Sequence, residues 1–369
     1  MIYKDKIRER LEDISYLELK EGASVKVGEE KFYGYLPLPI LNSRLVDLVK
    51  ETVEDIPGEY FLEGMIYVLS LDFENEYAKQ YIDFIKSYTK DIKGYLFSKG
   101  VEFVNKEDYM EGIIYLDALR NLDLADEKVY FALGTALENL DITIFTDLEK
   151  TNHAIDIMNT YEKVLNIDDE FSLAHYKLGY IYREFGQFVK AKLSFEKFLN
   201  LDKNDFRLQE VREVLEDLES ETLREEAILE MNSGNYENAL EKLLKVNPNK
   251  RDDLFYYHLS LCYGNLKEYD ASLDAINIAI EMEDISIYHN QKAIAYQGQG
   301  HLDLARAELE NALEKFGTDY YLNFNLGTIL YNQGNTEEAI ENFEEAYRVE
   351  PSEELLDIIN QLENALDSN

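Results

Sequence analysis

The chain has 369 residues, and 46% of them are hydrophobic, which is enough to bury a core and argues against a disordered protein. Its 75 Asp and Glu residues outnumber the 37 Lys and Arg residues, so the formal net charge is -38. Because phosphate backbones and anionic lipid headgroups are bound by clustered Lys and Arg, this charge argues against nucleic acid and membranes as partners.

The N-terminus and the cysteine content bear on the compartment. Residues Met1 to Arg8 are charged almost at once and lack the apolar stretch of a signal peptide. No segment approaches the roughly 18 uninterrupted apolar residues of a membrane span. The single cysteine, Cys262, excludes an internal disulfide framework and a multi-cysteine metal site. We therefore expect a cytoplasmic protein.

Residues 1–56 differ from the rest of the chain. Helices are predicted over 2–19 and 40–54, whereas the stretch between them contains Gly and Pro residues and cannot continue a helix. A small hairpin is predicted in that stretch from the apolar residues Val25, Val27, Tyr33 and Tyr35. The region is either an N-terminal cap without repeats or the seat of a separate function, and the sequence leaves both open.

From residue 57 onwards, small residues recur inside helical patterns at a spacing that clusters near 34 residues, with two longer gaps. The members of this series are Gly64, Gly100, Gly134, Gly179, Ala227, Ser260, Ala293 and Gly327. A second series lies about twelve residues later in most units. Two helices approach closely only where one side chain is small and large neighbours fill the space, so the pattern predicts stacked helix pairs.

The last repeat shows the pattern most fully. It reads Leu326-Gly327, then Gly334-Asn335, Ala339, Phe343, Ala346 and Pro351. This arrangement resembles a tetratricopeptide repeat almost position for position, and the segment from Leu178-Gly179 to Phe195 is similar. The resemblance implies an all-α fold, a right-handed superhelical solenoid of antiparallel helix pairs.

The spacing divides the chain into two stacked arrays. The predicted parts are a first array over 57–205 with a degenerate first unit at 57–92, an internal capping or bridging helix at 206–219, a second array over 220–353 and a capping helix at 354–369. Residues 206–218 carry one apolar stripe, as an exposed solenoid end requires.

In the tetratricopeptide-repeat family, the first helix of each pair lines the concave groove in which peptides usually lie. Applied to this sequence, the resemblance places thirteen candidate peptide contacts in the groove: Tyr176, Tyr180, Arg183, Tyr257, His258, Asn265, Asn290, Gln291, Tyr321, Phe324, Asn325, Tyr331 and Asn332. Amide side chains can bond a peptide backbone, and aromatic rings give flat contact area. The alternative is that some of these rings pack between helices.

The groove positions do not reproduce the Lys/Asn/Arg clamp with which some family members grip acidic chaperone tails. Lys177 and Arg183 stand as isolated cations among aromatic and amide residues. An apolar or mildly basic segment is therefore the expected partner.

Enzymatic functions find little support. None of the five histidines has the spacing of a paired metal ligand, and His175 and His289 occupy positions where these repeats bury a large ring. Gly298-Gln299-Gly300 follows no strand, so it does not fit a dinucleotide site. We expect no catalytic, cofactor or metal site.

Three functions remain. The first is a non-enzymatic scaffold that binds a polypeptide segment in its groove. The second is a peptide-gated regulator whose superhelix changes pitch on binding, with a hinge near 206–220. The third, an enzyme whose activity resides in 1–56, has the weakest support because the stretch is too short for most catalytic domains.

Overall fold

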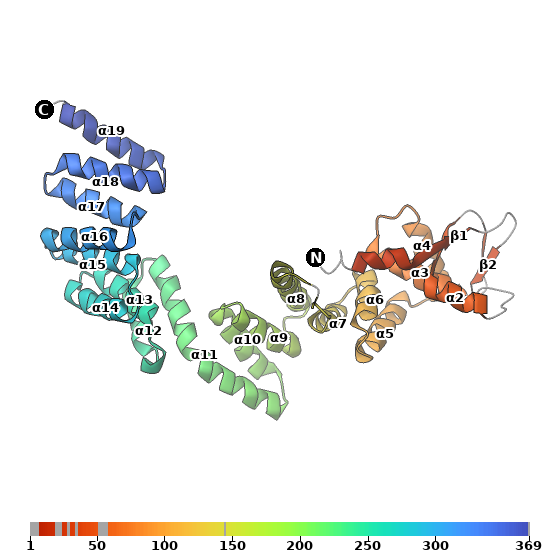
Figure 1. Cartoon of the computed structure of the whole chain (residues 1–369). Coiled ribbons are helices and arrows are strands. Elements are labelled where there is room, and N and C mark those ends of the chain that lie inside the picture. Colours follow the sequence, from red (N-terminus) through yellow and green to blue (C-terminus); the bar gives the residue numbers. More distant parts are fainter. Residues whose placement is uncertain are drawn as a thin grey trace. The chain divides into compact units, whose positions relative to one another are not determined.

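The computed structural model describes residues 7–18, 24–27, 30–33, 36–50, 58–143 and 145–367 (Figure 1). Within these ranges, four short strands come first, and eighteen α-helices (α2–α19) follow them. Consecutive helices form antiparallel pairs, which confirms the predicted helical architecture. Among the described residues, no helix combines the length and the apolarity that a bilayer span requires.

The N-terminal region contains strands where a helix was predicted. A 3₁₀ helix, η1 (Glu9–Asp13), leads into β1 (Ile14–Leu17), which pairs antiparallel with β4 (Leu38–Leu41). The prediction of a helix over 2–19 is therefore wrong at Ile14–Leu17, because pairing with a distant strand overrides the local helical pattern. Helix α2 (Asn42–Lys50) falls within the predicted 40–54.

The predicted hairpin is confirmed. Strand β2 (Ser24–Val27) pairs antiparallel with β3 (Glu30–Tyr33), and Val25 lies opposite Phe32. Tyr35, which was assigned to the same hairpin, lies outside the described residues.

The first helix pair is α3 (Gly58–Leu71) and α4 (Ala78–Tyr88), and α3 packs against β4 as well as α6. A Cβ atom at Gly64 would lie 2.2 Å from the carbonyl oxygen of Pro39. Gly64 belongs to the predicted series of small residues, but it receives the backbone of a strand instead of the side chain of a partner helix. The N-terminal region is thereby packed onto the repeats.

The chain forms two compact units. Unit 1 comprises residues 1–186 and 193–208, and unit 2 comprises residues 187–192 and 209–369. The remaining helices that lie wholly or mostly in unit 1 are α5 (Ile92–Asn105), α6 (Tyr109–Asn121), α7 (Glu127–Glu138), α8 (Asp147–Ile167), α9 (Ser172–Glu184) and α10 (Phe188–Leu201).

Small residues allow the pairs of unit 1 to nest, as predicted. A Cβ atom at Gly179 in α9 would lie 2.5 Å from Cε1 of Phe195 in α10. Gly134 in α7 is similarly close to the ring of Tyr161 in α8. The missing side chain therefore makes room for a buried ring in each pair.

Unit 2 continues the pattern after α11 (Asp205–Asn232), which begins in unit 1. Its helices are α12 (Tyr236–Lys245), α13 (Asp253–Asn265), α14 (Tyr269–Met282), α15 (Ser286–Gly298), α16 (Leu302–Phe316), α17 (Tyr320–Asn332), α18 (Thr336–Val349) and α19 (Glu353–Asp367), with a 3₁₀ turn η2 (Pro248–Lys250). The turn glycines Gly234, Gly300 and Gly334 have positive φ angles.

Two predicted helices at the edges of the arrays are present. The stretch 206–218 lies within α11, which continues without a break to Asn232. Helix α19 packs on α18 through Leu355 and Ile359, which are buried. The capping and bridging roles of these helices stay predictions, as does the stacking of two arrays.

Candidate functional site

Three first helices of unit 2 form one contacting series, because α13 packs against α15 and α15 against α17. Each begins with an exposed apolar side chain at an equivalent position, and these are Leu254, Ile287 and Tyr321, spaced 33 and 34 residues apart. They are 44%, 39% and 56% exposed, respectively. A repeated exposed apolar side chain on neighbouring helices is unusual for a surface that only meets water.

Two further apolar side chains are exposed on the same helices. Ile294 lies seven residues after Ile287, about two helical turns, and Tyr331 lies near the end of α17. We call the five residues Leu254, Ile287, Ile294, Tyr321 and Tyr331 the first-helix face of unit 2. Tyr321 and Tyr331 were predicted as peptide contacts, whereas Leu254 and Ile287 were not.

The other aromatic residues predicted on these helices pack partly within the fold. The ring of Tyr257 lies 5.3 Å from that of Tyr288, and the ring of Phe324 lies 5.6 Å from that of Phe343 in α18. Both residues are half-buried. Each ring therefore contacts another ring of the fold and is only partly open to a ligand.

The predicted amides divide into buried and exposed ones. Asn290 and Gln291 are 8% and 5% exposed. Nδ2 of Asn325 donates to Oδ1 of Asn290 at 2.7 Å, and Nε2 of Gln291 donates to the hydroxyl of Ser260 at 3.3 Å. These amides link neighbouring first helices, whereas Asn265 and Asn332 are exposed.

His258 is half-buried in α13, close to an ion pair. Arg224 donates two hydrogen bonds of 2.9 Å to the carboxylate of Asp252, the N-cap of α13. Burial and, after it, the charge of Arg224 lower the pKa of His258 to about 4, although the charge of Asp252 opposes them. Because the ring is neutral above that pH, it can act as a hydrogen-bond acceptor or donor without charge.

Tyr176, Tyr180 and Arg183, the predicted contacts on α9, belong to unit 1. The rings of Tyr176 and Tyr180 lie 5.1 Å from Phe198 and 5.0 Å from Phe195, both in α10. These two tyrosines thus pack between the helices of their pair, which was the alternative considered for aromatic residues at these positions.

His289 makes short polar contacts within unit 2. Its ring nitrogens lie 2.5 Å from Glu308 and 2.8 Å from Asp284. The described residues hold no group of three or more His, Cys, Asp or Glu side chains arranged to bind a metal ion. The expected packed role of His289 agrees with these contacts.

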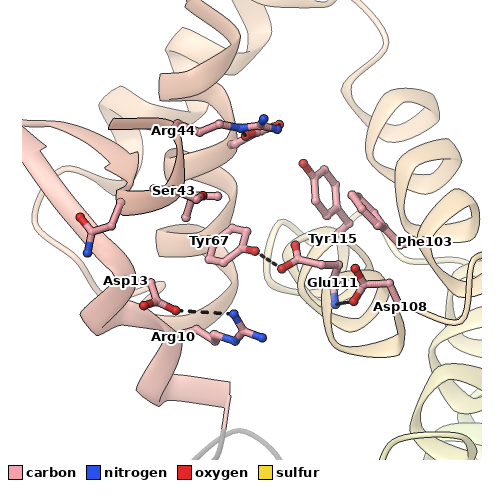
Figure 2. Close-up of a pocket in the computed structure, with 12 residues that line it drawn as sticks. Arg10, Asp13, Ser43, Arg44, Tyr67, Phe103, Asp108, Glu111 and Tyr115 are labelled. Atoms are coloured by element: carbon pink, nitrogen blue, oxygen red, sulfur yellow. Dashed lines mark hydrogen bonds and ion pairs between the residues drawn. The ribbon is translucent and has the colours of Figure 1, made fainter. Parts of the chain in front are cut away.

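A pocket of about 380 Å³ lies in unit 1. Figure 2 shows its two walls: Arg10, Asp13, Arg44 and Tyr67 come from the N-terminal elements and α3, and they face residues of α5 and α6. The opposite wall carries Phe103, Asp108, Glu111 and Tyr115. The sequence did not predict this pocket, because it forms only where the N-terminal strands and α3 meet the next helix pair.

A hydrogen bond joins the two walls of the pocket. The hydroxyl of Tyr67 donates to Oε1 of Glu111 (Figure 2). Burial raises the pKa of Glu111; the bond from Tyr67 lowers it, and the charge of Asp108 raises it. A positive charge next to this carboxyl group would stabilise its ionised form.

Comparison with known proteins gives matches over parts of the chain. Family profiles of the tetratricopeptide repeat match residues 173–205 and 290–353. A TPR repeat-containing protein of Methanocaldococcus jannaschii, MJ1428, is 29% identical over 132 residues, which are 35% of this chain and 23% of that protein. The small glutamine-rich tetratricopeptide repeat-containing protein 2 of Mycosarcoma maydis is 33% identical over 94 residues, 24% of this chain and 26% of that protein.

The chain thus spans about a quarter of the length of these two relatives. Among solved structures, a tetratricopeptide repeat protein from Parabacteroides merdae is 19% identical and covers 74% of this chain and 98% of its own, with a TM-score of 0.39. One matched segment covers nearly all of α9 and the whole of α10, and the other covers most of α15 and the whole of α16, α17 and α18. The chain thus contains tetratricopeptide repeats at residues 173–205 and 290–353.

Proposed function

We propose that the first-helix face of unit 2 binds an extended polypeptide segment, apolar or mildly basic, and that the chain is a non-enzymatic scaffold. Tetratricopeptide-repeat proteins generally serve as scaffolds for protein interactions. The observation that carries the proposal is the recurrence of Leu254, Ile287 and Tyr321 as exposed side chains on helices that contact one another. An extended segment with apolar side chains could bury all three.

The charge around the face supports the chemistry of the partner. Asp252 and Asp319 cap the N-termini of α13 and α17, next to Leu254 and Tyr321. The whole chain has a formal net charge of -38. A basic flank on the partner would be attracted to this surface, and its association rate should fall as salt is added.

A matched pair of variants tests the proposal. Ile287 on first helix α15 and Ile278 on second helix α14 are 39% and 38% exposed, so Ile287→Ala and Ile278→Ala remove the same group from similar environments. Peptides are selected from a random display library on the whole chain, and their affinities are measured by fluorescence polarisation. We expect Ile287→Ala to weaken binding about tenfold and Ile278→Ala to change it less than about twofold.

Equal effects of the two variants would contradict the proposal, as would peptides that keep their affinity for the double variant Ile287→Ala/Tyr321→Ala. Circular dichroism of each variant checks that the helices are intact. The peptide-gated alternative stays a prediction. Small-angle scattering with and without a saturating selected peptide measures it, since a change of pitch changes the dimensions of the chain.

A further inference from the structure

The pocket of unit 1 has an unbalanced set of charges. Its lining contains the carboxylates of Asp13, Glu63, Asp108 and Glu111 and the guanidinium groups of Arg10 and Arg44. The lining therefore carries two more acidic groups than basic ones.

Both arginines of the pocket already have a carboxylate partner. Nε and Nη2 of Arg44 donate to the two oxygens of Glu63 at 2.7 and 2.8 Å. Arg10 lies 3.5 Å from Asp13, and its charge also acts on Glu111. The lining offers Asp108 and Glu111 no arginine or lysine at salt-bridge distance within the described residues.

Aromatic rings stand next to these two carboxylates. The ring centroids of Phe103 and Tyr115 lie 5.4 Å apart, and Tyr115 is 3% exposed while Tyr67 is 4% exposed. In Figure 2, Phe103 and Tyr115 lie above Glu111 and Asp108 on the same wall. Aromatic faces attract cations, and the attraction is stronger where water is excluded.

We propose that this pocket binds a guanidinium group, held by the carboxylates of Glu111 and Asp108 and covered by the rings of Phe103 and Tyr115. A guanidinium group is planar, weakly hydrated and able to donate two parallel bonds to a carboxylate, so it fits an acidic and aromatic site better than an ammonium group. A cavity of about 380 Å³ lies within the usual size range of ligand pockets and can admit an arginine side chain. The site lies in unit 1 and does not depend on the first-helix face of unit 2.

Burial of Glu111 gives the proposal a pH dependence. Burial raises the pKa of its carboxyl group, and Asp108 and Glu63 act in the same direction, whereas Tyr67 and Arg10 oppose them. Protonated Glu111 cannot attract a cation. Binding of a guanidinium group should therefore weaken on acidification, and Glu111→Gln should remove part of that dependence.

Binding to the full-length protein is measured by isothermal titration calorimetry with three probes. Methylguanidinium supplies a free guanidinium, the peptide N-acetyl-Gly-Arg-Gly-amide supplies an arginine side chain, and the same peptide with citrulline supplies a neutral isostere. We expect both guanidinium probes to bind and the citrulline peptide not to bind at up to about 10 mM. Tighter binding of the peptide than of methylguanidinium identifies a polypeptide as the source, and the reverse identifies a small molecule.

Variants locate the binding. Glu111→Gln keeps an acceptor for Tyr67 and should weaken both guanidinium probes at least about tenfold. Glu102→Gln changes an exposed carboxylate on α5 that lies outside the pocket and should leave their affinity unchanged. Ile287→Ala should also leave it unchanged, which separates this site from the first-helix face of unit 2.

Three results would overturn the proposal. They are equal binding of the citrulline and arginine peptides, the same affinity in Glu111→Gln as in the original protein, and no binding of either guanidinium probe to the folded protein. The comparison of the two peptides on the original protein needs no variant, so it decides the question even where a substitution disturbs folding.

Discussion

The side-chain amide of Asn325 donates a hydrogen bond of 2.7 Å to Oδ1 of Asn290, and this bond joins α17 to α15. Asn290 is only 8% exposed. A buried acceptor that loses its donor keeps the cost of its desolvation. The two amides therefore stabilise the contact between neighbouring first helices as a pair.

Asn325→Ala should destabilise the contact between α15 and α17 by about 1–3 kcal/mol, because Oδ1 of Asn290 then lacks its partner. The double variant Asn290→Ala/Asn325→Ala should lose less free energy of this contact than the two single variants lose together. Hydrogen–deuterium exchange of α15 and α17 measures the local free energy of opening. Asn332→Ala, on the exposed end of α17, serves as the control and should change it by less than about 0.5 kcal/mol. Strictly additive losses would show that the two amides do not act together.

Gly179→Ala should destabilise the α9–α10 pair by about 1–3 kcal/mol, because its Cβ atom would lie 2.5 Å from the ring of Phe195. Adding Phe195→Leu to this variant should restore part of the lost stability, because the smaller side chain makes room for the new Cβ atom. The matched control is Gly264→Ala, whose Cβ atom would come no closer than 3.3 Å to side-chain atoms. Thermal unfolding followed by circular dichroism measures the stability of all three variants. Equal destabilisation by the two glycine substitutions would contradict the packing argument.

His258 should make unit 2 less stable in mild acid. Burial and then the charge of Arg224 lower its pKa from 6.5 to about 4, so the unfolded chain takes up the proton first. The stability due to the neutral ring is complete above pH 6.5 and falls as the pH drops to 4, by at most about 3 kcal/mol. We expect His258→Gln to flatten the profile of unfolding free energy between these pH values. A profile unchanged by His258→Gln would refute the assignment.

Cys262 should resist thiol reagents in the folded protein. Its side chain is fully buried in α13, and burial raises the pKa of the thiol to about 11, whereas the thiolate is the reactive form. Labelling with iodoacetamide at pH 8 should be slow without denaturant and complete in urea. Since the chain has one cysteine, mass spectrometry reports this site alone. Fast labelling of the native protein would show that α13 opens readily.

The repeats could be predicted because their packing leaves a periodic mark on the sequence. Gly179 and Gly327 were assigned to helix contacts from spacing alone, and each faces a phenylalanine of its partner helix. Such contacts join residues only a helix apart, so a short window of sequence contains both partners.

The N-terminal strands and the unit 1 pocket could not be predicted in this way. Strand β1 looks helical by itself, and only its pairing with β4 fixes the extended backbone. Glu111 and Tyr67 are far apart in the sequence and meet because α3 packs against α6. The periodic pattern of neither α3 nor α6 predicts the contact between these two residues.

The exposure of the candidate contacts in unit 2 could be predicted only in part, and their role in peptide binding stays a prediction. Tyr321 and Tyr331 are exposed as expected, but Asn290 and Gln291 bond to neighbouring helices. The sequence alone does not distinguish an amide side chain that faces solvent from one that bonds to a neighbouring helix. Ile287 was overlooked because an apolar residue at the start of a helix is usually part of the core.

The close approach of Pro39 to Gly64 decides how the role of the N-terminal region can be studied. Leu62, Met65 and Ile66 of α3 are fully buried, and β4 covers one side of that helix. Deleting the first 56 residues would strip this cover and leave an apolar helix in water, so the shortened chain should aggregate. A loss of binding in the shortened chain would therefore reflect misfolding. Single substitutions in the unit 1 pocket are the better test of what the N-terminal residues do.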